Sequence, residues 1–428
     1  MSAVESPFSY IDFLQGLDRF GIELGLEPIR ELLALMGNPH QSLRVVHVAG
    51  TNGKGSTCAY IAQMLHCSGY ATGRYTSPHL IDWPERIWVR GQSITPEALN
   101  QALQKVAAIL EQHPQLHITQ FEAFTAAAFA YFAQEQLDYV VVEVGLGGRL
   151  DATNVLEHPE DTVITSIGLD HQDRLGDTLA AIAREKAGII KSGVPIVLGD
   201  VPPEALWIIQ QRARELEAPL YLVPPAQTTP EGWCMEHFVY TTGLLGNIQA
   251  QNSALALQVG RLLGLADTSL REGLAQAQWP GRYQPVTYGG HKLLVDGAHN
   301  AEAALALRSY LGEQPVHWIM GVLNTKNYST MLQLLLRPGD QFSAVPVPSA
   351  ATVSPQALAQ SAERICPDLE QCEAYSTLEN ALAVLTKEQP ENKQTILCGS
   401  LYLVGYFLKL LNPSYLLNVS NVARRNPF

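Results

Sequence analysis

The chain has 428 residues, of which 46% are hydrophobic and 16% are charged, which is typical of a folded protein with more than one core. The formal net charge of −13 argues against a nucleic-acid partner, so any anion site must be built locally from Lys, Arg and backbone N–H groups. No apolar run approaches the roughly 18 residues of a membrane span, and the N-terminus lacks the features of a secretory signal.

Apolar runs alternate with helical patterns through the first 280 residues. Short β-branched runs predict strands at 43–49, 139–144 and 161–167, and the runs PIVLGD and PLYLV continue the series. Helices are predicted at 56–68, 95–113, 121–136, 177–192 and 252–263. Thr95 is the expected N-cap of the second helix, because Pro96 and Glu97 follow it. This order predicts an α/β fold with a mostly parallel sheet.

The alternation restarts after QWPGRYQPVTYGG, a segment rich in Pro, Gly and aromatic residues that we interpret as a hinge. The runs HKLLVD, VHWIM, QFSAVPV and QTILC predict strands, and helices are expected at 300–311, from Tyr328, at 377–387 and from Leu401. The sequence therefore predicts two domains, an ATP-binding domain at 1–280 and a smaller, Rossmann-like α/β domain at 281–428.

The segment VVHVAGTNGKGST has the outline of a phosphate-binding loop between a strand and a helix. It departs from the pattern G-x-x-x-x-G-K-[ST], because Val48 replaces the first Gly and Gly55 separates Lys54 from Ser56. Glycines allow close backbone approach to a phosphate, Lys54 supplies charge, and the Ser56 hydroxyl suits a metal. The alternative is a simple turn in which Ser56 only caps the helix. Three glycines and a Lys at this point favour the nucleotide interpretation.

Three metal-ligating candidates lie where carboxyl ends of strands are expected: Ser77 follows GRYT, Glu143 lies near the end of the run 139–144, and His171 lies a few residues after VITSI. Oxygen ligands with an imidazole suit Mg²⁺ or Mn²⁺, and ligands in open α/β sheets gather at the carboxyl ends of strands. Ser77 can also be read as a turn residue and His171 as an ordinary loop histidine. Glu143 is harder to explain otherwise, since a carboxylate on a buried strand needs a partner.

Further charged residues lie in glycine-rich or turn segments. GLGGRLDATN at 145–154 contains Arg149 and Asp151, and its glycines allow the backbone to fold over a ligand. Lys186 lies on a predicted helix, where the alternative to a catalytic role is an ion pair with Asp177 or Glu185. In the second half, VDGAHN places Asp296, His299 and Asn300 at a strand-to-helix turn, and Arg282 lies in the expected hinge.

Taken together, these segments resemble the folylpolyglutamate synthase/dihydrofolate synthase family, relatives of the Mur peptide ligases. The resemblance spans nearly the whole chain and rests on nine blocks in order: GTNGKGS, YTSPHL, FEAFTAAAF, VVEVGLGGRLDATN, SIGLDHQDRLG, REKAGI, WPGRYQ, VDGAHN and LCGS. The family's own loop is G-T-N-G-K-G-[ST], so the unusual spacing matches it.

The resemblance implies an ATP-dependent amide ligase with a P-loop-type ATPase domain. ATP activates a carboxylate as an acyl phosphate, and L-glutamate displaces the phosphate. The carboxylate belongs to dihydropteroate in the synthase reaction and is the γ-carboxylate of a folate in polyglutamylation. The implied cofactors are ATP and Mg²⁺, with a monovalent cation such as K⁺ as a further candidate. The implied partners are these small molecules, with no nucleic acid and no membrane.

The resemblance also implies roles for particular residues of this chain. The implied ATP-binding residues are Thr51, Asn52, Gly53, Lys54, Gly55, Ser56, Asn252, Arg282 and Asp296. The implied metal ligands are Ser77, Glu143 and His171, and the implied catalytic residues are Lys54, Lys186 and His171, with Lys186 matching a lysine that is carbamylated in the family. The implied substrate-binding residues are Glu23, Leu24, Gly25, Gln120, Phe121, Glu122, Leu150, Asp151 and Ala152 for the pterin substrate, and His299 and Ser400 for glutamate.

Some positions depart from the family. Glu23 begins the stretch ELGLEPI where an Asp is also seen, and both are acidic. In GVLNTKN, Asn324 and Asn327 replace the carboxylates of the usual G-x-x-x-D-K-D, which leaves Lys326 without an assigned role.

Alternatives remain open at this stage. The first alternative is a folylpolyglutamate synthase alone, although ELGLEP favours dihydropteroate binding. A Mur-type ligase is disfavoured because only about 44 residues precede the first predicted strand. A nucleotide-binding regulator has no need of the turn at Asp296–Asn300. The six scattered cysteines form no C-x-x-C pair, which favours a cytoplasmic protein, and a monomer is expected.

Overall fold

The computed structural model describes residues 8–17, 25–387 and 393–411 of the chain. Contacts divide the chain into two compact units. The first unit comprises Met1–His79, Trp83–Thr242 and Ala250–Ala277, and the second comprises Leu80–Asp82, Gly243–Gln249 and Gln278–Phe428. Two short segments of the predicted first domain, 80–82 and 243–249, therefore pack with the second unit, and no local sequence pattern marks them.

The first unit is built on an eight-stranded sheet of order β4-β3-β2-β5-β1-β6-β7-β8. The strands, in that order, are Gln92–Ser93, Ile87–Val89, Thr72–Tyr75, Tyr139–Glu143, Val45–Ala49, Asp161–Ile164, Ile196–Leu198 and Leu220–Leu222. All neighbours pair in parallel except β2 with β3 and β3 with β4. The central strands β1 and β5 are buried at every residue, which explains their continuous apolar runs.

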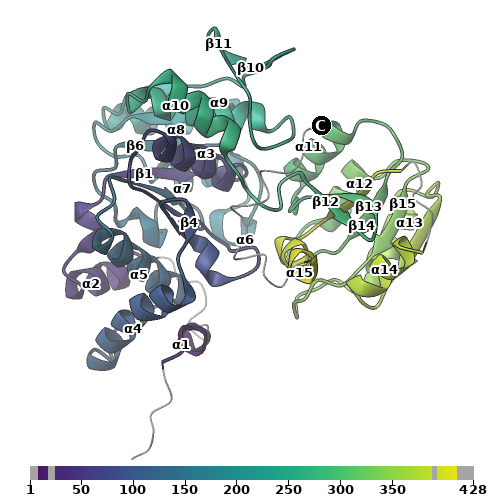
Figure 1. Cartoon of the computed structure of the whole chain (residues 1–428), viewed down its shortest axis with the longest axis horizontal. Coiled ribbons are helices and arrows are strands. Elements are labelled where there is room, and N and C mark those ends of the chain that lie inside the picture. Colours follow the sequence, from purple (N-terminus) through teal and green to yellow (C-terminus); the bar gives the residue numbers. More distant parts are fainter. Residues whose placement is uncertain (1–7, 18–24, 388–392, 412–428) are drawn as a thin grey trace, which may run out of the picture. The chain divides into compact units, whose positions relative to one another are not determined.

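Helices cover both faces of this sheet, as Figure 1 shows. One group contains α3 (Lys54–Cys67), α9 (Gln249–Leu262) and α10 (Asp267–Gln276). On the other side lie α2 (Glu27–Leu35), α4 (Pro96–Gln112) and α5 (Gln120–Gln134), with α1 (Tyr10–Leu17) packed against α4 and α5. The helices α7 (Leu179–Ala187) and α8 (Pro203–Glu215) share a core with β6 and β7, and α6 is the short Gln172–Leu175. The Thr95 hydroxyl caps α4 by accepting from the Ala98 amide at 3.2 Å, as expected.

The remaining elements of the first unit are short. Three-residue to four-residue strands form an antiparallel sheet of β9 (Gln227–Thr229), β10 (Gly232–Met235) and β11 (Phe238–Tyr240). The 3₁₀ turns are η2 (Pro39–Ser42), η3 (Trp83–Arg86) and η4 (Ala152–Val155).

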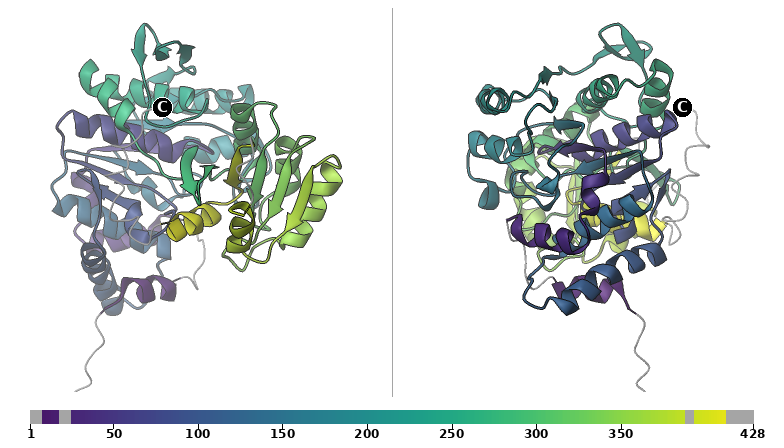
Figure 2. Two further views of the ribbon diagram at one scale, coloured as in Figure 1. Left: turned by 45° about the vertical axis from the view of Figure 1, so that its right-hand side comes forward. Right: turned by 90° about the vertical axis from the view of Figure 1, so that its left-hand side faces the viewer.

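The second unit has a six-stranded sheet of order β12-β13-β17-β14-β15-β16. Its strands are Gln284–Tyr288, His291–Val295, Thr395–Cys398, His317–Met320, Gln341–Ala344 and Gln371–Ala374. Side chains alternate between two cores. One core contains α11 (Ala301–Leu311), α12 (Tyr328–Leu335) and α13 (Pro355–Ile365), and the other contains α14 (Leu378–Leu385) and α15 (Leu401–Leu411), seen from a second side in Figure 2.

The segment interpreted as a hinge is in part a strand. Gln284–Tyr288 forms β12, which pairs antiparallel with β13 along its whole length, from Gln284 opposite Val295 to Tyr288 opposite His291. Proline and glycine content alone suggested a flexible link, whereas Pro285 lies on an edge strand, where proline is tolerated.

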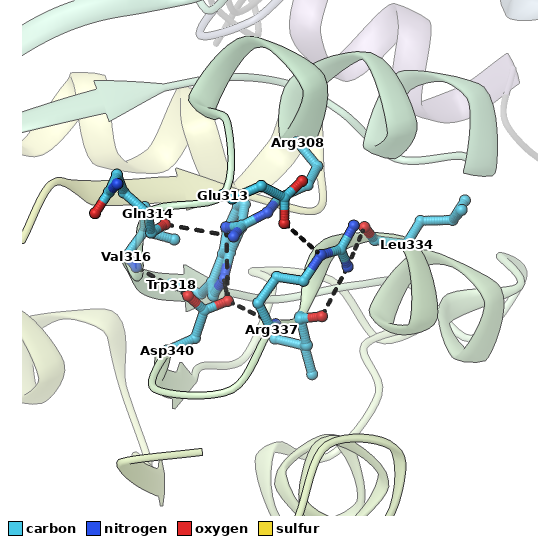
Figure 3. Close-up of polar contacts among 9 residues, drawn as sticks. Arg308, Glu313, Gln314, Val316, Trp318, Leu334, Arg337 and Asp340 are labelled. Carbon is cyan, nitrogen blue, oxygen red and sulfur yellow. Dashed lines mark hydrogen bonds and ion pairs between the residues drawn. The ribbon is translucent and has the colours of Figure 1, made fainter. Parts of the chain in front are cut away.

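A buried ion pair in the second unit joins Arg308 of α11 to Asp340, which directly precedes β15 (Figure 3). Arg308 and Asp340 are 2% and 0% exposed, and their charged groups approach to 3.7 Å. The Asp340 carboxylate also accepts from the Val316 amide, the Trp318 indole and the Arg337 amide, each at 2.9 Å.

These observations confirm the predicted α/β fold with a mostly parallel first sheet and a second sheet domain. In the part of the chain that the structure describes, no helix is both long and apolar enough to cross a membrane.

Candidate active site

The glycine-rich loop lies between β1 and α3. Gly50 and Gly53 have φ angles of +152° and +86°, and Gly53 is the N-cap of α3. A Cβ on Gly50 would lie 1.9 Å from the Thr165 hydroxyl oxygen, so the loop backbone packs directly against the end of β6. The sequence therefore places the N–H groups of a helix N-terminus where the chain can approach a phosphate closely.

Two hydroxyl residues after β6 hold this loop. The Thr51 amide donates to the Ser166 carbonyl and the Asn52 amide to the Ser166 hydroxyl, both at 2.9 Å. The Thr165 hydroxyl donates to the Asn52 carbonyl at 2.6 Å. Thr165 and Ser166 were missed from the sequence, where the only signal was a pair of hydroxyl residues at the end of a predicted strand.

Two lysines reach the same loop. The Lys54 ammonium folds back and donates to the carbonyls of Gly50 and Thr51, at 3.0 and 3.2 Å. Lys186 on α7 is only 4% exposed and donates to the Gly50 carbonyl at 2.8 Å. Glu185, a suggested alternative partner of Lys186, forms an ion pair with Arg149 at 2.9 Å.

Two of the three metal candidates meet. Glu143 ends β5, is 5% exposed, and accepts from the Ser77 amide at 3.1 Å. This contact follows from the parallel pairing of β2 with β5, which brings their carboxyl ends together. His171 precedes α6 in a left-handed conformation with φ of 50°, and its side chain is exposed. Among the described residues, no three His, Cys, Asp or Glu side chains form a group that would bind a metal.

The donors of this pair fit a hard divalent cation. A buried carboxylate beside a serine supplies oxygen atoms, which Mg²⁺ and Mn²⁺ prefer over nitrogen or sulfur. The exposed His171 is the N-cap of the short helix α6, which follows β6, the strand next to β1, so it belongs to the same end of the sheet.

Asn252 on α9 lies against the glycine loop. Its side chain is 3% exposed, and its Oδ1 would lie 2.3 Å from a Cβ on Gly53. The structure thus brings the implied nucleotide residue Asn252 to the N-cap of α3, although the two are about 200 residues apart in sequence.

The turn after β13 forms a second group of candidates, in the second unit. The buried Asp296 accepts from the amides of Tyr283 and Ala298, at 3.0 and 2.8 Å. Burial raises the pKa of Asp296, and the nearby Arg282 cation opposes that shift. Asn300 caps α11 by accepting from the Ala303 amide at 2.9 Å.

His299 and Ser400 lie at the same edge of the second sheet. His299 Nδ1 donates to the Gly297 carbonyl at 2.8 Å, which fixes the ring and its tautomer. Ser400 follows β17, is 3% exposed, and accepts from the Tyr402 amide at 3.2 Å. The Gly399 amide donates to the Ala298 carbonyl at 3.0 Å, so the two turns are joined.

The residues implied to bind the pterin substrate lie on several different elements. Glu23 and Leu24 lie outside the described residues, whereas Gly25 lies next to Leu26, the N-cap of α2. Gln120, Phe121 and Glu122 form the first turn of α5, with Gln120 donating to the Leu14 carbonyl at 3.1 Å. The Phe121 ring packs against Gly145, where a Cβ would lie 2.6 Å from the ring.

Two implied substrate carboxylates are engaged in local structure. Glu122 completes a capping box, accepting from the Thr119 amide and hydroxyl at 2.9 and 2.7 Å. Asp151, flanked by Leu150 and the buried Ala152, caps η4 by accepting from the Thr153 amide at 3.0 Å. Both side chains therefore shape the backbone around them, and contact with a substrate would be an additional role.

Comparison with known proteins agrees with this geometry. A Mur ligase middle domain model matches residues 48–200, and a model of the dihydrofolate synthetase C-terminal domain matches residues 281–410. A dihydrofolate synthase/folylpolyglutamate synthase of Bacillus subtilis is 39% identical over 76% of this chain and 81% of its own length.

Solved structures match the chain almost end to end. Escherichia coli FolC in complex with DHPP and ADP has a TM-score of 0.83 at 28% identity, covering 96% of this chain and 99% of that one. A bifunctional folylpolyglutamate synthase/dihydrofolate synthase with Mn, AMPPNP and L-glutamate bound has a TM-score of 0.82 at 31% identity, covering 95% and 98%. These matches confirm the resemblance seen in the sequence, and the chain belongs to the dihydrofolate synthase/folylpolyglutamate synthase family of ATP-dependent ligases.

Proposed function

We propose that this protein joins L-glutamate to dihydropteroate, forming dihydrofolate, and to the γ-carboxylate of folates. One observation carries the proposal. The glycine loop after β1 and the Glu143–Ser77 pair after β5 and β2 occupy the carboxyl ends of adjacent strands. A phosphate-binding helix N-terminus beside oxygen ligands for a divalent cation is the arrangement that phosphoryl transfer from ATP requires.

The reaction has two steps. An oxygen of the acceptor carboxylate attacks the γ-phosphorus of ATP, the bond to the β,γ-bridging oxygen breaks, and ADP leaves. The amine nitrogen of glutamate then attacks the acyl carbon of the acyl phosphate. The carbon–oxygen bond to phosphate breaks, the amine loses a proton, and an amide and inorganic phosphate are released.

Negative charge grows on the transferring phosphoryl group, and the chain has donors for it. The N–H groups at the start of α3 and the Lys54 ammonium are preorganised to stabilise this charge. A divalent cation held by Glu143 and Ser77 would neutralise further phosphate charge. We assign this cation as Mg²⁺, with His171 as a further ligand, and a monovalent cation such as K⁺ stays a prediction.

The other implied residues keep their roles as proposals. Thr51, Asn52, Gly53, Gly55, Ser56 and Asn252, with Arg282 and Asp296 of the second unit, bind the nucleotide. His299 and Ser400 bind glutamate. The pterin substrate is bound by Glu23, Leu24 and Gly25, by the first turn of α5, and by Leu150, Asp151 and Ala152, and the relative crystallised with DHPP supports a pterin acceptor. The domain division at residue 280, the cytoplasmic location and the monomeric state stay predictions.

Phosphate release tests the proposal. The full chain is assayed with ATP, Mg²⁺ and L-glutamate, together with dihydropteroate in one arm and tetrahydrofolate in the other. Release in both arms, with the matching glutamylated products by mass spectrometry, is the expected result. Release with tetrahydrofolate alone would restrict the protein to folylpolyglutamate synthesis, and release with neither would overturn the proposal.

A further inference from the structure

A histidine lies at the centre of the first sheet, on the strand that leads into the glycine loop. His47 is 0% exposed, and every other residue of β1 is apolar. Burial lowers the pKa of His47 to about 3, so the ring is neutral at physiological pH. A hydrophobic residue would fill this position without the cost of burying a polar ring, which suggests that the ring has a use.

That use is visible in its hydrogen bond. His47 Nε2 lies 2.8 Å from the Thr153 hydroxyl oxygen, and the same oxygen lies 2.5 Å from Asp151 Oδ1. The Thr153 hydroxyl donates its single hydrogen to Asp151 Oδ1, and the same carboxylate accepts from the Thr153 and Leu146 amides. Burial raises the pKa of Asp151, and these hydrogen bonds oppose that shift. Thr153 must then accept from His47, which places the His47 proton on Nε2.

The other His47 nitrogen agrees with this assignment. Nδ1 is buried and makes no hydrogen bond to any described residue. An unprotonated Nδ1 is a lone acceptor, whereas a protonated one would be an orphaned buried donor. The hydrogen bonds thus run in one direction, from His47 through Thr153 to Asp151.

Asp151 in turn accepts a hydrogen bond from the backbone that follows β5. Its Oδ2 accepts from the Leu146 amide at 2.8 Å, and the neighbouring Gly145 amide helps to lower the pKa of this carboxyl against the effect of burial. Gly145 lies two residues after Glu143, and its backbone packs against the Phe121 ring. The chain of contacts therefore links β1 to Asp151, a residue assigned above to the pterin substrate, and to the Leu146 backbone that Asp151 holds.

We propose that His47 is a positioning residue for the acceptor substrate: acting through Thr153, it fixes the Asp151 carboxylate and the Gly145–Leu146 backbone that this carboxylate holds. The inference rests on the proposed function only in naming the substrate that the segment meets. The link itself is independent of that assignment, because it is made of hydrogen bonds within the first unit.

Matched variants distinguish the effect of losing a hydrogen bond from the effect of changing side-chain packing. Thr153→Val keeps the shape but removes the hydroxyl, leaving the His47 donor orphaned and Asp151 one bond short, whereas Thr153→Ser keeps the hydroxyl. His47→Leu removes the donor, and His47→Gln can keep one at the position of Nε2. We expect Thr153→Val to raise the KM for dihydropteroate about tenfold while the KM for ATP changes less than about threefold. His47→Leu should act in the same direction, and the Ser and Gln variants should restore most of the loss.

Amide hydrogen exchange gives a readout that needs no substrate. We expect Thr153→Val and His47→Leu to speed exchange at Gly145 and Leu146, with the amides of the glycine loop unchanged. Exchange rates equal to those of the wild type in both variants would overturn the inference. It would also be overturned if the KM values for dihydropteroate and for ATP rose equally and the Tm of the variants fell. If the wild-type protein releases no phosphate with any pterin substrate, the proposed function fails, and the exchange experiment still decides the role of His47.

Discussion

Lys54 and Lys186 donate to the same atom, the carbonyl oxygen of Gly50, at 3.0 and 2.8 Å. One carbonyl has two lone pairs and can accept both, but two ammonium groups sharing it repel each other. Lys54 is half-buried and has a second acceptor in Thr51, whereas Lys186 is 4% exposed. A change of charge at Lys186 would therefore relieve the repulsion without moving the loop.

Carbamylation of Lys186 is the first prediction. Its neutral amine would attack CO₂ and lose a proton, converting a cation into an anionic oxygen ligand beside the phosphate loop. We expect protein equilibrated with ¹³C-bicarbonate to show a carbamate signal by NMR that disappears in Lys186→Ala, together with most of the activity.

Lys191 supplies the control for that experiment. Burial lowers its pKa to about 8, so its amine is deprotonated more easily than that of an exposed lysine. Lys191→Ala should keep the carbamate signal. A signal that follows Lys191, or that is present unchanged in Lys186→Ala, would contradict the prediction.

Lys54 itself is expected to act on the transferred phosphoryl group. Lys54→Ala should lower kcat/KM by about 100-fold or more, as expected for loss of a donor aimed at transition-state charge. Steady-state phosphate release measures the effect, and Tm confirms that the variant is folded. Unchanged turnover would remove the catalytic interpretation of the loop.

The two ends of α3 offer a matched pair of glycines. Gly53 and Gly69 both have φ of +86°, but a Cβ on Gly53 would lie 2.3 Å from Asn252 Oδ1, whereas nothing lies within 4 Å of one on Gly69. Both Ala variants bear the same backbone strain of about 1–2 kcal/mol. We expect only Gly53→Ala to weaken ATP binding, by about tenfold or more, in a calorimetric titration. Equal affinities in the two variants would show that the Asn252 contact does not shape the nucleotide site.

The sequence predicted what depends on local chemistry or on parallel pairing. The N-cap Thr95 was placed correctly, because capping needs only nearby residues. Asn300 was expected at a strand-to-helix turn, and the structure shows that it caps α11 there. Ser77 and Glu143 were expected to converge, because both follow strands of one parallel sheet, and they do. The capping box of Thr119 and Glu122 was readable as T-x-x-E, yet the family resemblance drew attention to a substrate role instead.

Several features that the sequence did not predict depend on pairing between distant segments or on very short strands. The segment that forms β12 was interpreted as a hinge because it is rich in Pro, Gly and aromatic residues. It is a strand because β13 pairs with it along its whole length, and composition alone does not reveal that pairing. The strands β9 to β11 have three or four residues each, too few to show a period. The His47–Thr153 contact joins residues 106 positions apart, and no local pattern announces such a bond.

Glu143 should govern the metal requirement. Glu143→Gln keeps the size of the side chain but removes the charge that attracts a divalent cation, so half-maximal activity should need at least about tenfold more Mg²⁺. Asp138→Asn is the control, since Asp138 lies just before the same strand and also accepts a backbone amide, from Ala71 at 2.7 Å. The Mg²⁺ titration should be unchanged in Asp138→Asn. A Glu143→Gln curve that overlays the wild type would exclude Glu143 as a ligand.

The buried pair in the second unit predicts an asymmetry in stability (Figure 3). Asp340→Asn would leave Arg308 buried with one hydrogen bond, to the Gln314 carbonyl at 3.3 Å, and would place an amide NH₂ among three N–H donors. We expect a loss of about 3–5 kcal/mol in the free energy of unfolding, measured by urea denaturation of the full chain.

Arg308→Met should cost clearly less. Asp340 would keep its three N–H donors, and Met would replace a guanidinium whose Nε and Nη1 make no hydrogen bond to any described residue. Burial lowers the pKa of Arg308, which shows that its charge is held at a cost that the 3.7 Å contact with Asp340 only partly offsets. If Arg308→Met were as destabilising as Asp340→Asn, the ion pair would outweigh the hydrogen bonds to the carboxylate, contrary to the geometry of the cluster.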